Sequence, residues 1–351
     1  MAVLGLKDQI MVSAYLKEAT FDAGVTMNAT NACSLVNLNK IEPAWDDKIA
    51  NDKADYTGKE HGYVQEIQNK GNKISLGSDH CTPNLLSFVA GLCLGGITNT
   101  QDGVTGAYTH KFLPVAAESA LPSCQIEYLR GGVQYAYKGM KGGSFKVMGK
   151  AGEYINVSLE AIGSGTRAIS ATAFVAAITE SWLKLDTCSV WTENDASIVI
   201  AASPVQGTQS ISSGAGTARK TTIRSFEFDW NNDLDIMYGF GGAGVAQDIR
   251  AKRRKATIKA TFDFAGQADL NLFLNQNVTA IDFDLKGALI AGTTYAGARL
   301  RIPRMMMTKA PLPKGGINEI LSCDMEWDIY DNGTNSAVEI YTYNQKAAYL
   351  A

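Results

Sequence analysis

Leu121-Pro-Ser-Cys-Gln-Ile-Glu-Tyr128 and Gly152-Glu-Tyr-Ile-Asn-Val-Ser-Leu-Glu-Ala161 flank a Gly-rich link, and together they decide the fold class of this chain. In the second stretch, Ile155, Val157 and Leu159 alternate with polar residues. This period of two is typical of a strand that buries one face and leaves the other in water. The stretch therefore predicts a pair of antiparallel strands with one apolar face.

The same design returns about one hundred residues later in the chain. Thr222-Ile-Arg-Ser-Phe-Glu-Phe228 and Ala256-Thr-Ile-Lys-Ala-Thr-Phe-Asp-Phe264 flank another Gly-rich link. Self-similar segments at a fixed spacing indicate a duplicated unit. A duplicated β unit with few candidate catalytic groups favours a protein that builds a structure over one that converts a substrate.

Alternation continues at Ile281–Leu285 and at Cys323–Ile329, whereas helical signals are short. Thr82 is a good N-cap and Pro83 suits the first helical position, which predicts a helix that ends at Gly95-Gly96. Ala268–Leu274 predicts a second helix. We predict a mainly β protein of antiparallel sandwich or barrel modules with short flanking helices. The predicted division is an arm with loops (1–80), a first module (81–202), a Gly/Ser/Thr linker (203–218) and a second module (219–351).

Composition narrows the function classes. The 351 residues carry a net charge of −3, so nothing indicates a general affinity for the phosphate backbone of nucleic acids. The N-terminus lacks the basic and apolar regions of a signal peptide, and no apolar run approaches the length of a membrane span. The six Cys show no paired spacing, so we expect reduced thiols and synthesis in a cytoplasm.

Few motifs indicate chemistry. Gly239-Phe-Gly-Gly-Ala-Gly244 matches the dinucleotide-binding pattern, but alternating strand follows it instead of a helix, so we interpret it as a hairpin tip. The basic run Arg250–Lys255 is interpreted as a solvated hairpin base or a contact to a neighbouring subunit. The three His are far apart, and no hydrolase, P-loop or zinc-protease motif occurs. We predict no catalytic, cofactor or metal site.

The order of several loose motifs resembles the tail tube (major tail) proteins of long-tailed bacteriophages. The segments that carry this resemblance are Asn84–Gly95, Ala107–Pro114, Leu121–Ile126, Thr222–Gly244 and Arg299–Arg304, the last of which resembles a late edge strand. Residues 1–75 match poorly. The resemblance implies β-sandwich modules that close into rings, and rings that stack into a tube in the virion tail.

The resemblance also implies partners. The lumen of such a tube first holds a tape-measure protein and later conducts double-stranded DNA without sequence preference, and tail terminator and baseplate proteins meet the tube at its ends. A wall that does not retain phosphates is expected to be acidic. The candidate lumen-facing residues are Glu127, Glu160, Glu227, Asp229 and Asp263. The candidate inter-ring or inter-subunit contacts, which include hairpin tips in Gly139–Gly149 and Gly239–Gly244, are Gly142, Gly143, Gly241, Gly242, Arg250, Lys252, Arg253 and Arg254.

Two questions stay open at this point. A virion adhesin or decoration protein on the same sandwiches is the alternative function, and it predicts a discrete oligomer and exposed aromatic patches. The second question is the ring stoichiometry. Two modules per chain predict a trimeric ring with pseudo-sixfold symmetry, which we favour, whereas two hairpins of one enlarged module predict a hexamer.

Overall fold

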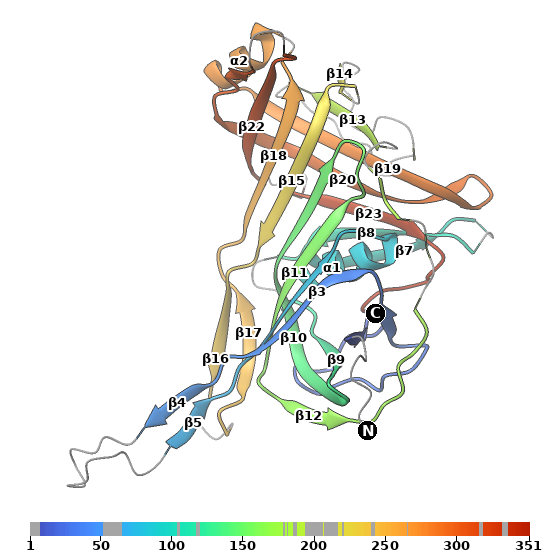
Figure 1. The fold of residues 1–351 in the computed structure, drawn as a ribbon, viewed down its shortest axis with the longest axis vertical. Coiled ribbons are helices and arrows are strands. Elements are labelled where there is room, and N and C mark those ends of the chain that lie inside the picture. Colours follow the sequence, from blue (N-terminus) through green and yellow to red (C-terminus); the bar gives the residue numbers. More distant parts are fainter. Residues whose placement is uncertain are drawn as a thin grey trace.

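Antiparallel β-sheet makes up most of the structure, as the sequence predicts, and both predicted helices are present (Figure 1). The strands pair into one closed barrel and two separate hairpins. The computed structural model describes residues 8–51, 65–103, 106–116, 120–177, 180, 182–184, 188–193, 206, 217–219, 221–239, 243–264, 266–315, 319–331 and 336–351.

The first sheet runs along the long axis of the molecule (Figure 1). Its neighbouring strands are all antiparallel, and strands such as β11, β15, β18 and β22 alternate buried apolar residues with polar ones. In order across the sheet they are β3 (Leu38–Trp45), β6 (Asn72–Ser78), β11 (Asn156–Gly163), β10 (Val133–Lys150), β15 (Ile223–Asn231), β18 (Lys255–Asp263) and β22 (Ser322–Ile329).

The second sheet continues from β22 and crosses behind the first at a steep angle (Figure 1). Phe226 of β15 and Phe283 of β19 join the two layers, with ring centroids 4.4 Å apart. The strands of this sheet are β7 (Gly95–Gln101), β8 (Tyr108–Pro114), β13 (Cys188–Glu193), β14 (Thr217–Ala218), β19 (Val278–Ala291), β20 (Thr294–Lys309), β21 (Pro313–Lys314) and β23 (Glu339–Asn344).

The first half of β10 belongs to a third group of strands, and this group corrects the expected arm at residues 1–80. The group consists of β1 (Gln9–Val12), β2 (Cys33–Leu35), β9 (Cys124–Arg130) and β12 (Arg167–Ser170). Ile10 and Val12 of β1 and Ile74 of β6 are fully buried in the main hydrophobic core. Strands β1, β2 and β6 of this segment are therefore part of the sheets. The sequence did not predict them, because their short apolar runs alternate with polar residues too weakly.

Helix α1 (Pro83–Leu94) lies in the core, against β10, β8 and β23. It begins as predicted: the Thr82 hydroxyl accepts a hydrogen bond from the Leu85 N–H at 3.2 Å, and Pro83 follows the cap. All of its residues are buried, as expected for a helix that is apolar on every side. The second helix, α2 (Gln267–Leu274), lies at one end of the molecule (Figure 1).

The glycine run at Gly139–Gly149 is not a hairpin tip, which corrects the prediction. It lies inside β10, an 18-residue strand that passes from one sheet into the other. Gly139 has a φ of +62°, and the pairing of β10 with β9 shifts register between Tyr137 and Met140. A side chain at Gly142 would lie 2.4 Å from the Cys93 sulfur of α1. These glycines bend the strand and admit the helix.

Two hairpins extend beyond the first sheet at the end opposite α2 (Figure 1). One is β16 (Leu234–Tyr238) with β17 (Ala246–Ala251), and the other is β4 (Lys48–Asn51) with β5 (Gln65–Asn69). The motif Gly239–Gly244 links β16 to β17, which pair antiparallel. It therefore belongs to a hairpin, as predicted, and no helix N-terminus follows it to hold a pyrophosphate.

The two echoing copies are paired differently. In the first, β9 pairs with β1 and β10, and β11 pairs with β10 and β6, whereas in the second β15 pairs directly with β18. The second half of β10 pairs with β15, and the rings of Phe145 and Phe228 lie 5.5 Å apart in a common core. Of the predicted linker, only Gln206, Thr217 and Ala218 belong to the described residues. Gln206 accepts a hydrogen bond from the Tyr295 N–H at 3.0 Å. The division into two modules stays a prediction.

Candidate functional site

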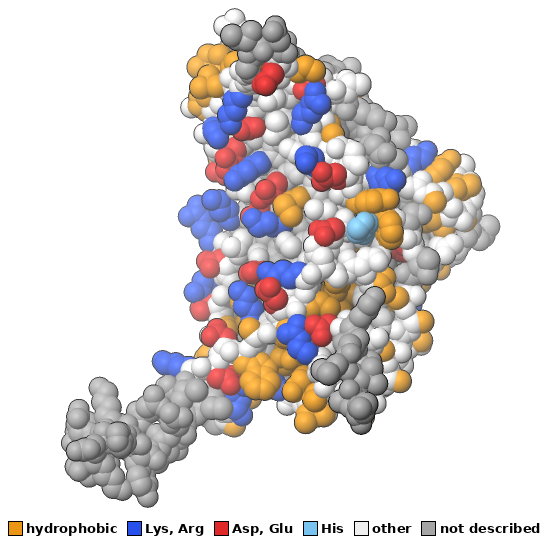
Figure 2. Space-filling view, viewed as in Figure 1, with side chains coloured by type: hydrophobic (Ala, Val, Ile, Leu, Met, Phe, Trp, Pro, Cys, Tyr) orange, Lys and Arg blue, Asp and Glu red, His pale blue; other side chains and the backbone are white. Residues whose placement is uncertain are grey.

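The outer face of the first sheet carries charges of both signs in a regular arrangement (Figure 2). Because the strands are in register, the outward side chains form rungs across the sheet. One rung reads Ser158, Lys146, Asp229, Thr257 and Asp328. The next reads Asn156, Met148, Glu227, Lys259 and Glu326. We call this surface, from β6 to β22, the charged face.

Four of the five predicted lumen residues lie on the charged face, and each is ion-paired. Lys146 lies 2.8 Å from Asp229 and 3.4 Å from Glu227. Glu160 lies 3.5 Å from Lys73 of β6, and Asp263 lies 2.7 Å from Arg224 of β15. On the charged face these carboxylates are therefore paired with Lys and Arg side chains, whereas the sequence suggested an acidic surface.

The fifth residue, Glu127, is elsewhere. It lies on β9 and is only 2% exposed. Its carboxylate accepts hydrogen bonds from the side-chain amides of Gln125 and Gln134, both at 2.6 Å. These internal bonds replace water around the carboxylate. Glu127 therefore does not contribute to the charged face, and its assignment as a lumen residue is not carried further.

The ion pairs keep their members charged. A hydrogen bond to Asp229 raises the pKa of Lys146, and a hydrogen bond from Lys314 lowers the pKa of Asp324. In the same way Asp263 raises the pKa of Arg224. Each partner favours the charged form of the other. The charged forms of Lys146, Arg224 and Asp324 are therefore favoured.

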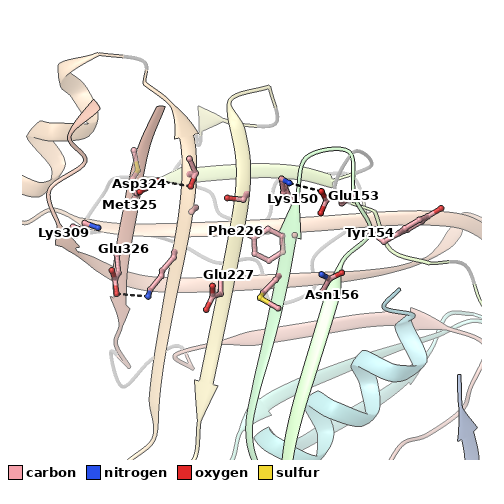
Figure 3. A pocket seen from close by; sticks show the side chains of 16 residues that line it. Lys150, Glu153, Tyr154, Asn156, Phe226, Glu227, Lys309, Asp324, Met325 and Glu326 are labelled. Atoms are coloured by element: carbon pink, nitrogen blue, oxygen red, sulfur yellow. Dashed lines mark hydrogen bonds and ion pairs between the residues drawn. The ribbon is translucent and has the colours of Figure 1, made fainter. Parts of the chain in front are cut away.

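A shallow groove crosses the charged face between β11 and β22 (Figure 3). All four carboxylates that line it have a cationic partner: Glu153 has Lys150, Glu227 has Lys146, Asp324 has Lys314, and Glu326 has Lys259. The lining contains no His or Cys. A general base needs a carboxylate that is free to take a proton. The groove does not provide one.

The predicted contact residues are divided between the interior and the surface. Gly142 and Gly143 are buried within β10, so they do not form an exposed contact. Gly241 and Gly242 lie outside the described residues. Arg250 pairs with Asp248 at 2.9 Å, and Lys252 pairs with Asp235 at 3.2 Å.

The remaining basic residues lie in the turn between β17 and β18. Arg253 is exposed. Arg254 donates from Nη1 to the Val115 carbonyl, and its Nε and Nη2 have no hydrogen-bond partner among the described residues. Burial lowers the pKa of Arg254. The unpartnered donors of Arg254 are buried, so of these two side chains only that of Arg253 is exposed to solvent.

Sequence reasoning missed a buried layer of charge in the second sheet. Arg299 and Arg301 of β20 are completely buried; Arg299 Nε lies 2.8 Å from Asp282 Oδ1, and Arg301 pairs with Glu339. The segment with Arg299 is not an edge strand, because β20 pairs with both β19 and β23. Alternating Asp on β19 and alternating Arg on β20 were the available signal, but only the register places them opposite each other.

The fold and this surface define a class of protein: an antiparallel β-sheet protein whose long sheet presents a mixed-charge face. A family model described as phage tail tube protein matches residues 14–329. The chain therefore belongs to the phage tail tube protein family, a structural family, and it is a tail component of the virion that self-associates into a tube. A comparison with curated proteins gives no match.

Within the described residues, neither α1 nor α2 has the length and apolar character of a membrane-spanning helix. The same residues contain no group of three or more His, Cys, Asp or Glu side chains placed to hold a metal ion.

Proposed function

We propose that this chain closes side by side into rings that stack into a tail tube. The lumen of this tube first holds the tape-measure protein and then conducts double-stranded DNA. Family membership over residues 14–329 carries the proposal. Assembly takes place in the host cytoplasm, and terminator and baseplate proteins bind the ends of the tube.

An open sheet edge supports closure side by side. In the described part of the chain, β3 pairs only with β6, and its Ile41 carbonyl accepts a hydrogen bond from the Arg130 side chain instead of from a further strand. Lys40 and Glu42 pair with each other on this strand, and Pro43 interrupts its row of N–H groups. Charges and proline are the usual protection of a free edge against uncontrolled pairing. Ring closure turns this protected edge into a joint with the next subunit.

The charged face is proposed to line the lumen. DNA binds proteins largely by releasing counterions when Lys and Arg neutralise its phosphates. On this face Lys73, Lys146 and Arg224 are already compensated by Glu160, Asp229 and Asp263. Such cations gain little from an additional phosphate, so DNA passes without being held. Arg250, Lys252, Arg253 and Arg254 are proposed as contacts to a neighbouring subunit.

We favour a trimeric ring with pseudo-sixfold symmetry over a hexamer. The neighbouring antiparallel pairs β10–β11 and β15–β18 lie in one sheet, which supports this choice. Native mass spectrometry of isolated rings tests it. A mass of three times the 37.6 kDa chain is expected, and a mass of six times that value rejects the trimer in favour of the hexamer. A discrete oligomer that never stacks would favour the adhesin alternative.

A further inference from the structure

Helix α2 lies at one end of the long axis (Figure 1), and apolar side chains of this region are exposed. We call this surface the α2 end. Its members come from α2 and from the segment between β20 and β22. They are Leu274 (62% exposed), Leu312 (60%), Ile320 (72%) and Leu321 (41%).

Helix α2 is held in place by an ion pair, and its apolar side chains are not buried in a hydrophobic core. Asp269 is its only buried residue, and the carboxylate lies 2.9 Å from the Arg219 guanidinium. Its leucines and Phe273 are half-buried or exposed. Within the described part of the chain, the apolar side chains of α2 are therefore only partly covered, while the ion pair holds the helix in place.

The opposite end of the long axis also exposes large apolar side chains, and we call it the β16 end. Its members belong to β12, to β16 and to the last residue of β3; Figure 1 shows β12 and β16 at this end, where β3 leads into β4. They are Trp45 (56% exposed), Ile169 (80%), Met237 (42%) and Tyr238 (38%).

Trp45 is held in a fixed position at the β16 end. Its indole N–H donates to the Tyr137 hydroxyl at 2.7 Å, and the Arg167 guanidinium lies 4.4 Å from its ring centroid. Arg167 is in turn paired with Asp47 at 2.6 Å. Interface hot spots are enriched in Trp, and a side chain that is already ordered loses less entropy on binding. Trp45 is therefore a preorganised anchor.

We propose that the α2 end of one copy docks onto the β16 end of the next copy along the tube. This proposal rests on the proposed function, since self-association makes a second copy the partner. The two ends differ in composition, so their contact is heterologous, and a heterologous contact without closure produces a filament. One charge pair lies beside each end, Lys314 with Asp324 and Arg167 with Asp47, so these charges enter the contact already compensated.

Substitution of each end tests the proposal. The α2-end variant is Leu274→Glu with Ile320→Glu, and the β16-end variant is Ile169→Glu with Met237→Glu. The matched control is Leu289→Glu, because Leu289 is 57% exposed on the β19–β20 hairpin, away from both ends. The assembly of each variant into rings and tubes is observed by electron microscopy and sedimentation of the whole chain. Thermal unfolding checks that each variant is folded. Each end variant is expected to form rings without tubes, and the control to form tubes of wild-type length.

A mixture of the two end variants gives the sharper result. Each variant keeps one intact end, so the mixture is expected to form stacks of two rings and nothing longer. Tubes of wild-type length from either folded end variant would overturn the proposal, while tube formation itself would still support the proposed function. Two-ring stacks from one variant alone would also overturn it, because they require contact between like ends. A wild-type protein that never forms rings or tubes contradicts the proposed function and, with it, this inference.

Discussion

Arg299 and Asp282 form an ion pair in which both side chains are completely buried, whereas Arg224 and Asp263 form one on the exposed charged face. Removing one partner of a buried pair leaves a charge without compensation, at a cost of about 3–5 kcal/mol. Arg299→Met is therefore expected to lower the free energy of unfolding by about that amount, as measured by urea titration. Arg224→Met is the matched control and is expected to change it little. Equal effects of the two substitutions would contradict the burial of the Arg299 pair.

Two titratable groups belong to a buried hydrogen-bond chain near the start of α1. Burial lowers the pKa of His110 from 6.5 to about 4, and burial raises the pKa of Glu180 from 4.5 to about 7. His110 Nδ1 lies 2.7 Å from the side-chain oxygen of Asn99, and Nε2 lies 3.1 Å from that of Asn344. The Asn84 N–H donates to Glu180 at 2.7 Å. These contacts favour the charged forms, but burial outweighs them, so both groups are uncharged around pH 6.

Their effects on stability have opposite signs. The contribution of His110 is complete above pH 6.5 and is lost as the pH falls to about 4. The contribution of Glu180 is complete below pH 4.5 and is lost as the pH rises to about 7. Each amounts to about 3 kcal/mol over its window, so in the wild type they offset each other where the windows overlap. Because of this overlap, the unfolding free energy of the wild type changes little with pH and does not reveal either group.

Single substitutions are expected to reveal the two slopes. In His110→Gln the unfolding free energy should fall with rising pH, because only Glu180 remains. In Glu180→Gln it should fall with falling pH, because only His110 remains. Chemical denaturation at several pH values between 4.5 and 7 measures both profiles. The double variant is the control, with a flat profile expected; parallel slopes in the two single variants would refute the assignment.

The glycines of strand β10 have a structural role that the sequence did not reveal. A Cβ at Gly142 would meet the Cys93 sulfur at 2.4 Å, whereas a Cβ at the adjacent Gly143 finds its nearest neighbour, the Glu160 carbonyl oxygen, at 3.3 Å. Overpacking of a core costs about 1–3 kcal/mol. Gly142→Ala is therefore expected to lower the thermal midpoint more than Gly143→Ala does. Cys93→Ala should partly rescue Gly142→Ala, and equal effects of the two glycine substitutions would show that α1 does not pack against Gly142.

The strands and helices with strong local signals were predictable. Residues 155–161 and 256–264 alternate clearly, and Thr82-Pro83 marks the start of α1. The run Gly139–Gly149 was misinterpreted because a glycine that admits a neighbouring helix looks the same in sequence as one in a turn. Which of the two applies depends on Cys93, nearly fifty residues away. The short strand β1 was missed for a similar reason, since its burial depends on pairing with β9.

At the scale of the whole molecule, alternation identified Glu160, Glu227, Asp229 and Asp263 as outward-facing residues of strands, but not their partners. The partner of each carboxylate is set by register between strands, as with Lys146 beside Asp229. Glu127 follows the same local pattern and is nevertheless buried, because β9 is enclosed by other elements. The sequence thus predicted which residues face outward, and the pairing of the strands determines which opposite charges lie beside them.

Reversal of charge on this face tests its role in DNA passage. Glu227→Lys with Asp229→Lys leaves Lys146 without compensation and adds new cations to the face. DNA ejection from intact virions is expected to slow, with a stronger dependence on salt, because uncompensated cations bind phosphates. The control is Lys146→Asp with Asp229→Lys, which reverses one pair and keeps the net charge. Normal ejection by the variant with Glu227→Lys and Asp229→Lys would contradict the assignment of the charged face to the lumen.

The central claim is that this chain builds a tube, and negative-stain electron microscopy of the purified protein tests it most directly. Concentration and salt are varied, because a weak heterologous contact assembles only above a threshold concentration. Stacked annular tubes with a continuous lumen are the predicted result. Compact monomers at every concentration and salt would contradict the claim.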